Sequence, residues 1–196
     1  MRTISLTSAN FQNVVEITAQ TLQKGGAVIA PTDTVYGLLA DATNENAVKK
    51  IYAIKNRPAK KPLPIFVKNM AMAKKLAKIS PEQQFFLETK WPGKFTAILR
   101  KNPNIKIYGA GKDTIASRVP FNRFINSLLE TFNAPIIGTS ANISGQPAST
   151  KIDEILSQFA GKSILPDLVI NAGDLPESAP SVIADITEKE PKIIRA

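Results

Sequence analysis

The residues best suited to hold an anion lie at 138–145, which reads Gly-Thr-Ser-Ala-Asn-Ile-Ser-Gly. An apolar run at 134–137 precedes them and predicts a buried strand. Small residues let the main chain approach a ligand closely, and hydroxyl and backbone N–H groups at a strand end can hold phosphates. A cluster of Ser, Asn and Gly after a strand is more often a simple turn. The segment therefore indicates a phosphate site only in combination with cationic residues elsewhere in the chain.

A basic segment at 55–62, Lys-Asn-Arg-Pro-Ala-Lys-Lys-Pro, supplies such cations. It follows a predicted helix, and positive charge at a helix C-terminus is favoured by the helix dipole whether or not a ligand binds. Arg57 precedes Pro58 and is held in extended backbone, and its guanidinium matches the oxygen atoms of a phosphate. From the local sequence alone, the segment can equally be a charged helix end without a ligand or a clamp for phosphate.

Arg118 lies inside an apolar strand pattern at 114–119, where a buried guanidinium requires an anionic partner. The partner is either a carboxylate of the chain or a carboxylate or phosphate of a ligand. Asp113 is the only acidic residue close to it in the sequence, so we favour a ligand.

Three further segments have both a structural and a functional interpretation. In the structural interpretation, residues 31–38, Pro-Thr-Asp-Thr-Val-Tyr-Gly-Leu, form a turn. In the functional interpretation, they form a pocket for a small polar substrate, and Tyr36 is one wall of that pocket. Residues 91–96, Trp-Pro-Gly-Lys-Phe-Thr, are best interpreted as structural packing. Arg195 lies near the C-terminus, where a frayed chain end is the simpler interpretation.

The composition limits the available chemistry. The 196 residues include neither Cys nor His, which excludes thiol catalysis, disulfides, and the usual general base and zinc ligand. The 25 Lys and Arg exceed the 16 Asp and Glu by 9, which favours nucleotides, RNA or DNA as partners, although scattered lysines also keep a surface soluble. No apolar run is long enough to span a membrane, and the N-terminus lacks the core of a signal peptide. We therefore expect a cytoplasmic protein without membrane partners.

Helical and strand patterns alternate along the chain, which predicts an α/β or α+β fold, a sheet covered by helices. Helices are predicted at 10–24, 46–55, 70–78, 81–90, 121–132 and 150–159. Strands are predicted at 27–31, 63–67, 95–100, 114–119, 135–138, 168–170, 181–186 and 192–194. Pro64 places the strand at 63–67 at a sheet edge or makes it a strand start, and residues 171–181 are expected to form a mobile loop.

Six motifs, in this order, resemble the YrdC-like family of threonylcarbamoyl-AMP synthases: PTDTVYGL at 31–38, KNRP at 55–58, WPGKFT at 91–96, SRVP at 117–120, TSANISG at 139–145 and PSVIAD at 180–185. The resemblance implies one domain at 1–196 in which a twisted mixed sheet, covered by helices, surrounds a large basic cavity. It also implies an enzyme, a nucleotidyltransferase. The reaction joins L-threonine, bicarbonate or CO2, and ATP to give threonylcarbamoyl-adenylate and pyrophosphate, for threonylcarbamoyladenosine in tRNA.

The resemblance further implies roles for individual residues. The expected ATP-binding residues are Arg57, Lys61, Thr114, Gly138, Ser140, Asn142 and Arg195. The expected threonine-binding residues are Thr34, Arg118 and Ser181. Lys55 and Arg57 would neutralise charge that develops on the phosphates, together with Mg2+ that arrives with ATP, and no metal site made by the protein itself is expected. A tRNA threonylcarbamoyl-transfer complex would receive the product.

Two other interpretations remain. A non-catalytic module that binds double-stranded RNA or tRNA in a basic cavity fits the net charge, although no RNA-binding signature with stacking aromatic residues is present. A family member with a different carbamoyl or nucleotide reaction is disfavoured by the intact TSAN and KNRP motifs. The sequence departs from the family pattern at Lys61, near Phe66 and at Ala148, which affects the nucleotide contacts more than the reaction.

Overall fold

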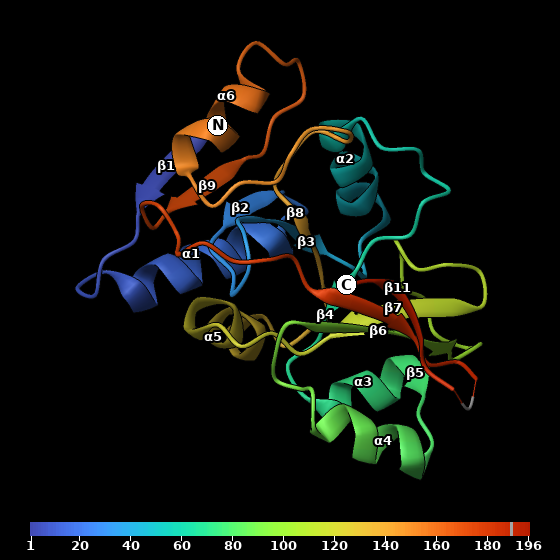
Figure 1. The fold of residues 1–196 in the computed structure, drawn as a ribbon. Coiled ribbons are helices and arrows are strands. Elements are labelled where there is room, and N and C mark those ends of the chain that lie inside the picture. Colours follow the sequence, from blue (N-terminus) through green and yellow to red (C-terminus); the bar gives the residue numbers. More distant parts are fainter. Residues whose placement is uncertain (189) are drawn as a thin grey trace.

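The computed structural model describes residues 1–188 and 190–196 (Figure 1). Its strands form one mixed sheet in the order β1-β9-β2-β3-β8-β4-β7-β6-β10-β11, with β5 paired to β6. The strands are β1 (Arg2–Ser5), β2 (Val28–Ala30), β3 (Gly37–Asp41), β4 (Ile65–Phe66), β5 (Ala77–Lys78), β6 (Phe95–Lys101), β7 (Thr114–Arg118), β8 (Ile136–Ser140), β9 (Leu168–Asn171), β10 (Val182–Asp185) and β11 (Lys192–Arg195). The helices are α1 (Phe11–Gln23), α2 (Glu45–Lys55), α3 (Met70–Leu76), α4 (Pro81–Glu88), α5 (Arg123–Phe132) and α6 (Ile152–Phe159). The predicted sheet covered by helices is confirmed.

The helices cover both faces of the sheet because successive strand residues point to opposite faces. In β2, Val28 packs with α1 and α5 in one buried cluster, whereas the neighbouring Ile29 belongs to the cluster that includes residues of α2 and α6. Figure 1 shows α1 and α5 side by side, away from α2 and α6. The central strands are therefore buried on both faces, which explains their continuous apolar pattern.

Side-chain caps fix several helix boundaries. Asn44 accepts hydrogen bonds from the backbone N–H groups of Asn46 and Ala47 at the start of α2. Ser80 and Gln83 form a reciprocal capping box at the start of α4. These local interactions satisfy N–H groups that a helix cannot pair itself, so they were accessible to sequence reasoning.

The sequence prediction missed three strands and placed a fourth ambiguously. The helix predicted at 70–78 is two residues too long, because α3 ends at Leu76 and residues 77–78 form β5. No strand is predicted at 37–41, and Gly37 and Leu38 fall in the segment interpreted as a turn or a pocket, yet β3 lies inside the sheet, antiparallel to both β2 and β8. β1 is mostly exposed and pairs in parallel with β9, so it carries little apolar signal. β4 lies between β7 and β8. Pro64 therefore precedes the first residue of an interior strand, and the edge alternative is wrong. Within the described residues, no helix has the length and apolar character needed to cross a membrane.

Candidate active site

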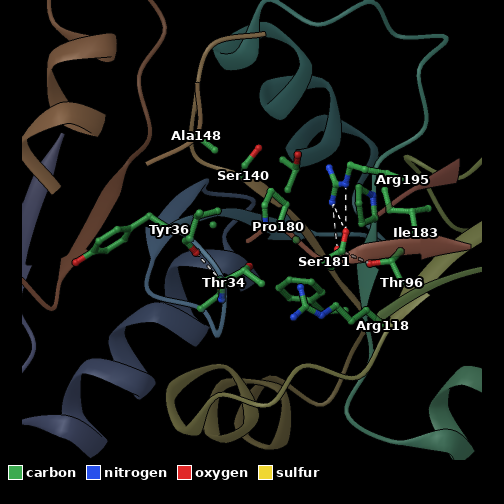
Figure 2. Close-up of a pocket in the computed structure, with 17 residues that line it drawn as sticks. Thr34, Tyr36, Thr96, Arg118, Ser140, Ala148, Pro180, Ser181, Ile183 and Arg195 are labelled. Atoms are coloured by element: carbon green, nitrogen blue, oxygen red, sulfur yellow. Dashed lines mark hydrogen bonds between the residues drawn. The ribbon is translucent and has the colours of Figure 1, made fainter. Parts of the chain in front are cut away.

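A cavity of about 130 Å³ opens beside the central strands (Figure 2). Register explains which segments meet there, because Gly37 of β3 lies opposite Ser140 of β8, and β4 aligns Phe66 with Arg118 of β7. The lining comes from eight separate parts of the chain: Thr32, Thr34, Val35, Tyr36, Gly37, Pro64, Phe66, Thr96, Arg118, Gly138, Thr139, Ser140, Ala148, Pro180, Ser181, Ile183 and Arg195. The predicted residues Thr34, Arg118, Gly138, Ser140, Ser181 and Arg195 are therefore brought together.

The charge of the cavity comes from two guanidinium groups, those of Arg118 and Arg195. The lysines of the basic segment do not line it. The large basic cavity expected from the resemblance is thus not shown, and the hollow that is present is small and lined with hydroxyl groups.

Arg118 has an internal partner. Its Nη2 donates to Oδ2 of Asp33 at 2.8 Å, its Nε donates to the Gly93 carbonyl at 2.8 Å, and both charged side chains are buried. Burial lowers the pKa of Arg118, and Asp33 opposes this shift by favouring the charged form. The expectation that a ligand, and no carboxylate of the chain, faces Arg118 is wrong, because the fold brings in an Asp that is 85 residues away.

Arg118 nevertheless keeps hydrogen-bonding capacity for a ligand. Among the described residues its Nη1 donates to no protein acceptor, while the side chain lines the cavity. The guanidinium also lies over the ring of Phe66, with 5.7 Å from Cζ to the ring centroid. Asp33 and Phe66 therefore hold the planar group in one orientation and leave one of its nitrogen atoms available.

Ser181 connects Arg195 to Thr96, as Figure 2 shows. Arg195 donates to the Ser181 carbonyl from Nε at 3.1 Å and from Nη2 at 2.7 Å. The Ser181 hydroxyl lies 3.0 Å from Oγ1 of Thr96. Arg195 is thus bound by its side chain to the cavity wall, so the interpretation as a frayed end is wrong.

A second pair of hydroxyl groups, those of Thr32 and Thr34, also lines the cavity. Oγ1 of Thr32 and Oγ1 of Thr34 are 3.1 Å apart, and the Thr32 hydroxyl donates to the Val35 carbonyl at 2.6 Å. Asp33, between them, points to Arg118 instead. The segment 31–38 therefore forms part of the cavity as well as a turn.

Lys55 lies beneath the segment 138–145 and not in the cavity. Its Nζ donates to the Ser140 carbonyl at 2.5 Å, the Asn142 carbonyl at 2.8 Å and Asn142 Oδ1 at 3.0 Å. Burial, assisted by the nearby charge of Arg57, lowers the pKa of this ammonium group to about 7. Asn142 is likewise turned into the loop, where it accepts from the Ser140 hydroxyl at 2.6 Å. Both residues shape the wall that presents Ser140.

The remaining predicted ligands lie outside the cavity lining. Arg57 donates from Nη2 to the Pro62 carbonyl at 2.9 Å and from Nε to the Lys61 carbonyl at 3.3 Å. The Lys61 side chain is exposed, and Thr114 is half-buried at the start of β7. Arg57 thus closes its own loop, and the fold alone does not bring this segment into contact with the cavity.

Gly138 allows a close approach that another residue would prevent. A Cβ atom at this position would lie 2.5 Å from Cδ2 of Phe66. The ring of Phe66 therefore packs directly on the main chain of β8 and on Arg118. This contact gives the Gly of the motif a packing role besides any role in ligand binding.

Sequence reasoning missed two residues that matter for this geometry. The motif at 91–96 predicts a packing role for Thr96, yet Thr96 lines the cavity and its hydroxyl lies within hydrogen-bonding distance of the Ser181 hydroxyl. The segment 31–38 predicts a turn at Asp33, yet Asp33 pairs with Arg118. Both lie in segments already noted for their unusual composition, but their partners are distant in the sequence.

The profile of the Sua5/YciO/YrdC family, which is described as telomere recombination, matches residues 20–196. The chain belongs to the Sua5/YciO/YrdC family. This Sua5/YciO/YrdC protein is 37% identical over 183 residues to the threonylcarbamoyl-AMP synthase of Pyrococcus abyssi, covering 92% of the chain and 53% of the relative. It is also 37% identical over 177 residues to a provisionally named threonylcarbamoyl-AMP synthase of Methanocaldococcus jannaschii, covering 90% of the chain and 82% of the relative.

Solved structures agree with the family assignment. The P. abyssi Sua5 structure complexed with L-threonine superposes with a TM-score of 0.86 at 35% identity, covering 99% of the chain and 56% of that protein. Escherichia coli YciO superposes with a TM-score of 0.83 at 23% identity, covering 99% of the chain and 93% of that protein. At this low identity, the similarity supports the fold alone. The Sua5/YciO/YrdC chain thus spans about half the length of the P. abyssi protein.

Proposed function

We propose that this protein is an L-threonylcarbamoyladenylate synthase that acts in tRNA modification. One observation carries the proposal: the cavity joins a guanidinium held by a carboxylate, paired hydroxyl groups and the 138–145 segment. A 35% identical Sua5 with the same fold was solved with L-threonine. The names of the P. abyssi and M. jannaschii relatives support the same reaction.

The size and polarity of the cavity favour a small zwitterion as its occupant. Its volume of about 130 Å³ is well below the ~300–1,000 Å³ of sites that enclose drug-sized ligands. In the proposed complex, the threonine carboxylate accepts from the Arg118 guanidinium, and the remainder of the amino acid contacts Thr34 and Ser181. A charge-assisted hydrogen bond from a preoriented Arg would fix the substrate in one orientation.

ATP would then bind at the open side of the cavity, with its phosphates between Ser140 and the basic segment. Arg57 and Lys61 are the proposed phosphate ligands, and Thr114, Gly138, Asn142 and Arg195 are proposed to border the nucleotide. Within residues 1–188 and 190–196, no three carboxylates gather into a cation site. Mg2+ in this proposal is therefore held by the ATP phosphates and water, as is common for this ion.

The reaction needs alignment more than a strong base. The neutral threonine amine adds to CO2 and loses a proton, which gives a carbamate. The carbamate oxygen then attacks the α-phosphorus of ATP, a new P–O bond forms, and the bond to pyrophosphate breaks. Alignment of bound reactants can supply about 7–11 kcal/mol of barrier reduction, and guanidinium groups can stabilise the charge on the phosphates.

Pyrophosphate release tests the proposal. The purified protein with ATP, Mg2+, L-threonine and bicarbonate should release pyrophosphate, and omission of threonine or bicarbonate should abolish the release. Mass spectrometry with labelled bicarbonate should place the label in a threonylcarbamoyl-adenylate. Binding of tRNA that weakens steeply with salt, in the absence of any turnover, would instead favour the RNA-binding module. A tRNA threonylcarbamoyl-transfer complex is the proposed recipient of the product.

A further inference from the structure

Tyr36 has its backbone at the cavity and its side chain directed away from it (Figure 2). The residue lies just before β3 and is fully buried. Its ring packs in the larger hydrophobic cluster, so the phenol does not serve as an exposed pocket wall. The buried hydroxyl must therefore find partners within the protein.

The phenol binds the start of the segment 172–181. Its hydroxyl donates to the Gly173 carbonyl at 2.5 Å and accepts from the Ala172 N–H at 3.0 Å. Gly173 has φ +74°, which places the turn after β9 in the left-handed region. The other end of this segment supplies Pro180 and Ser181 to the cavity. Tyr36 thus fixes one end of a segment whose far end touches the proposed ligand.

The backbone of Tyr36 holds two further parts of the wall. Its carbonyl accepts from the Ala141 N–H at 2.8 Å, directly after Ser140, and its N–H donates to the Ser149 carbonyl at 3.4 Å, directly after Ala148. Leu175 also donates from its N–H to the Thr150 carbonyl at 2.9 Å. The segments that follow β8 and β9 are therefore joined to each other and to Tyr36.

We infer that Tyr36 is a positioning residue for the cavity. Its buried phenol sets the path of residues 172–181 and therefore the position of Ser181. The inference rests on the proposed function for its kinetic consequence. Arg195 and Thr96 hold Ser181 from the other side, so loss of the phenol should displace the segment without detaching it. The effect should fall on threonine, which contacts Ser181 in the proposed complex, more than on ATP.

The test compares Tyr36→Phe with the matched control Thr18→Val. Both substitutions remove a buried hydroxyl that donates to a backbone carbonyl, since Thr18 Oγ1 donates to Val14 in α1 at 2.7 Å. Tyr36→Phe should raise the KM for threonine by about tenfold, a change that the loss of one to two buried hydrogen bonds can produce. The kcat and the KM for ATP should each change by less than about twofold. Thr18→Val should leave all three constants unchanged. An unchanged KM for threonine in Tyr36→Phe overturns the inference.

Hydrogen exchange separates the inference from the proposed function. The Leu175 N–H donates to the Thr150 carbonyl and not to Tyr36. Its exchange should be faster in Tyr36→Phe and unchanged in Thr18→Val. This result would show that the segment 172–181 has loosened, whether or not the protein turns over substrates. Unchanged exchange at Leu175 overturns the inference even if the enzyme is active. If Tyr36→Phe does not fold, Gly173→Ala provides the test. It retains the phenol but strains a backbone with φ +74°, and it should give the same two results.

Discussion

Asp33 and Arg118 form a buried ion pair, with 2.8 Å between Oδ2 and Nη2, and both side chains are at least nine-tenths buried. The carboxylate also accepts from the Phe121 N–H at 2.9 Å. Asp33 therefore orients Arg118 and links β7 to the segment before β3. The pair has both a structural consequence and a consequence for binding.

Asp33→Asn should destabilise the protein. Removal of one partner leaves a buried guanidinium without its counter-charge, which costs about 3 kcal/mol. Urea denaturation monitored by fluorescence of Trp91 measures the free energy of unfolding. Glu45→Gln removes a carboxylate from the exposed Lys49 pair and should have no measurable effect. Equal stability of Asp33→Asn and the wild type would contradict a structural role for the pair.

Arg118 should control threonine binding more than ATP binding. Because Arg118→Ala alone leaves Asp33 unpaired, the double variant Asp33→Asn, Arg118→Gln is compared with Asp33→Asn. The double variant should show a KM for threonine at least about tenfold higher, as loss of a charge-assisted hydrogen bond predicts, with a smaller change for ATP. Equal changes in the two constants would argue against pairing with the threonine carboxylate.

Arg57 should be essential for adenylate formation and dispensable for folding. Its guanidinium contacts only backbone carbonyls of its own loop among the described residues. Arg57→Ala should lower kcat/KM for ATP by about 100-fold or more, as removal of a charge stabiliser does, with little change in Tm. Arg100→Ala is the control, because Arg100 is also an exposed guanidinium, bonded to Thr187 and Glu188. A folded and fully active Arg57→Ala would exclude the phosphate clamp.

Gly138→Ala should impair folding and activity through Phe66. The added Cβ would lie 2.5 Å from Cδ2 of the ring, so the ring must move away from β8 and from Arg118. Overpacking of this kind costs about 1–3 kcal/mol. The double variant Gly138→Ala, Phe66→Leu should regain part of the lost stability, measured by thermal denaturation. No recovery would indicate that the clash lies elsewhere.

Lys55 should make stability depend on pH. Burial lowers its pKa in the folded protein from the ordinary 10.5 to about 7. Between these values the unfolded chain binds more protons, so the contribution of Lys55 to the free energy of unfolding rises with pH, by up to about 1.4 kcal/mol per pH unit. Denaturation of the wild type and Lys55→Met from pH 7 to 9.5 should show the wild type gaining stability relative to the variant. Parallel curves would contradict the lowered pKa.

Much of the secondary structure could be predicted because its signals are local. Asn44 and Ser80 cap helices through contacts within three residues, and the apolar residues of β6, β7 and β8 mark largely buried strands. β3 was missed because Gly37 and the preceding polar residues resemble a turn. Its strand conformation depends on pairing with β2 and β8, which no local window contains.

For the site, the sequence by itself determined which chemical groups are available: guanidinium and hydroxyl groups with a Gly-rich strand end, and no Cys or His. Only the tertiary structure decided which groups face the cavity. The fold brought Arg118 to Asp33 and Ser181 to Thr96, and it placed Lys55, at the end of α2, against Asn142 rather than in the cavity. The physical reason is that a side chain's charge is encoded locally, whereas its partner and its exposure depend on strands that pair across the whole chain.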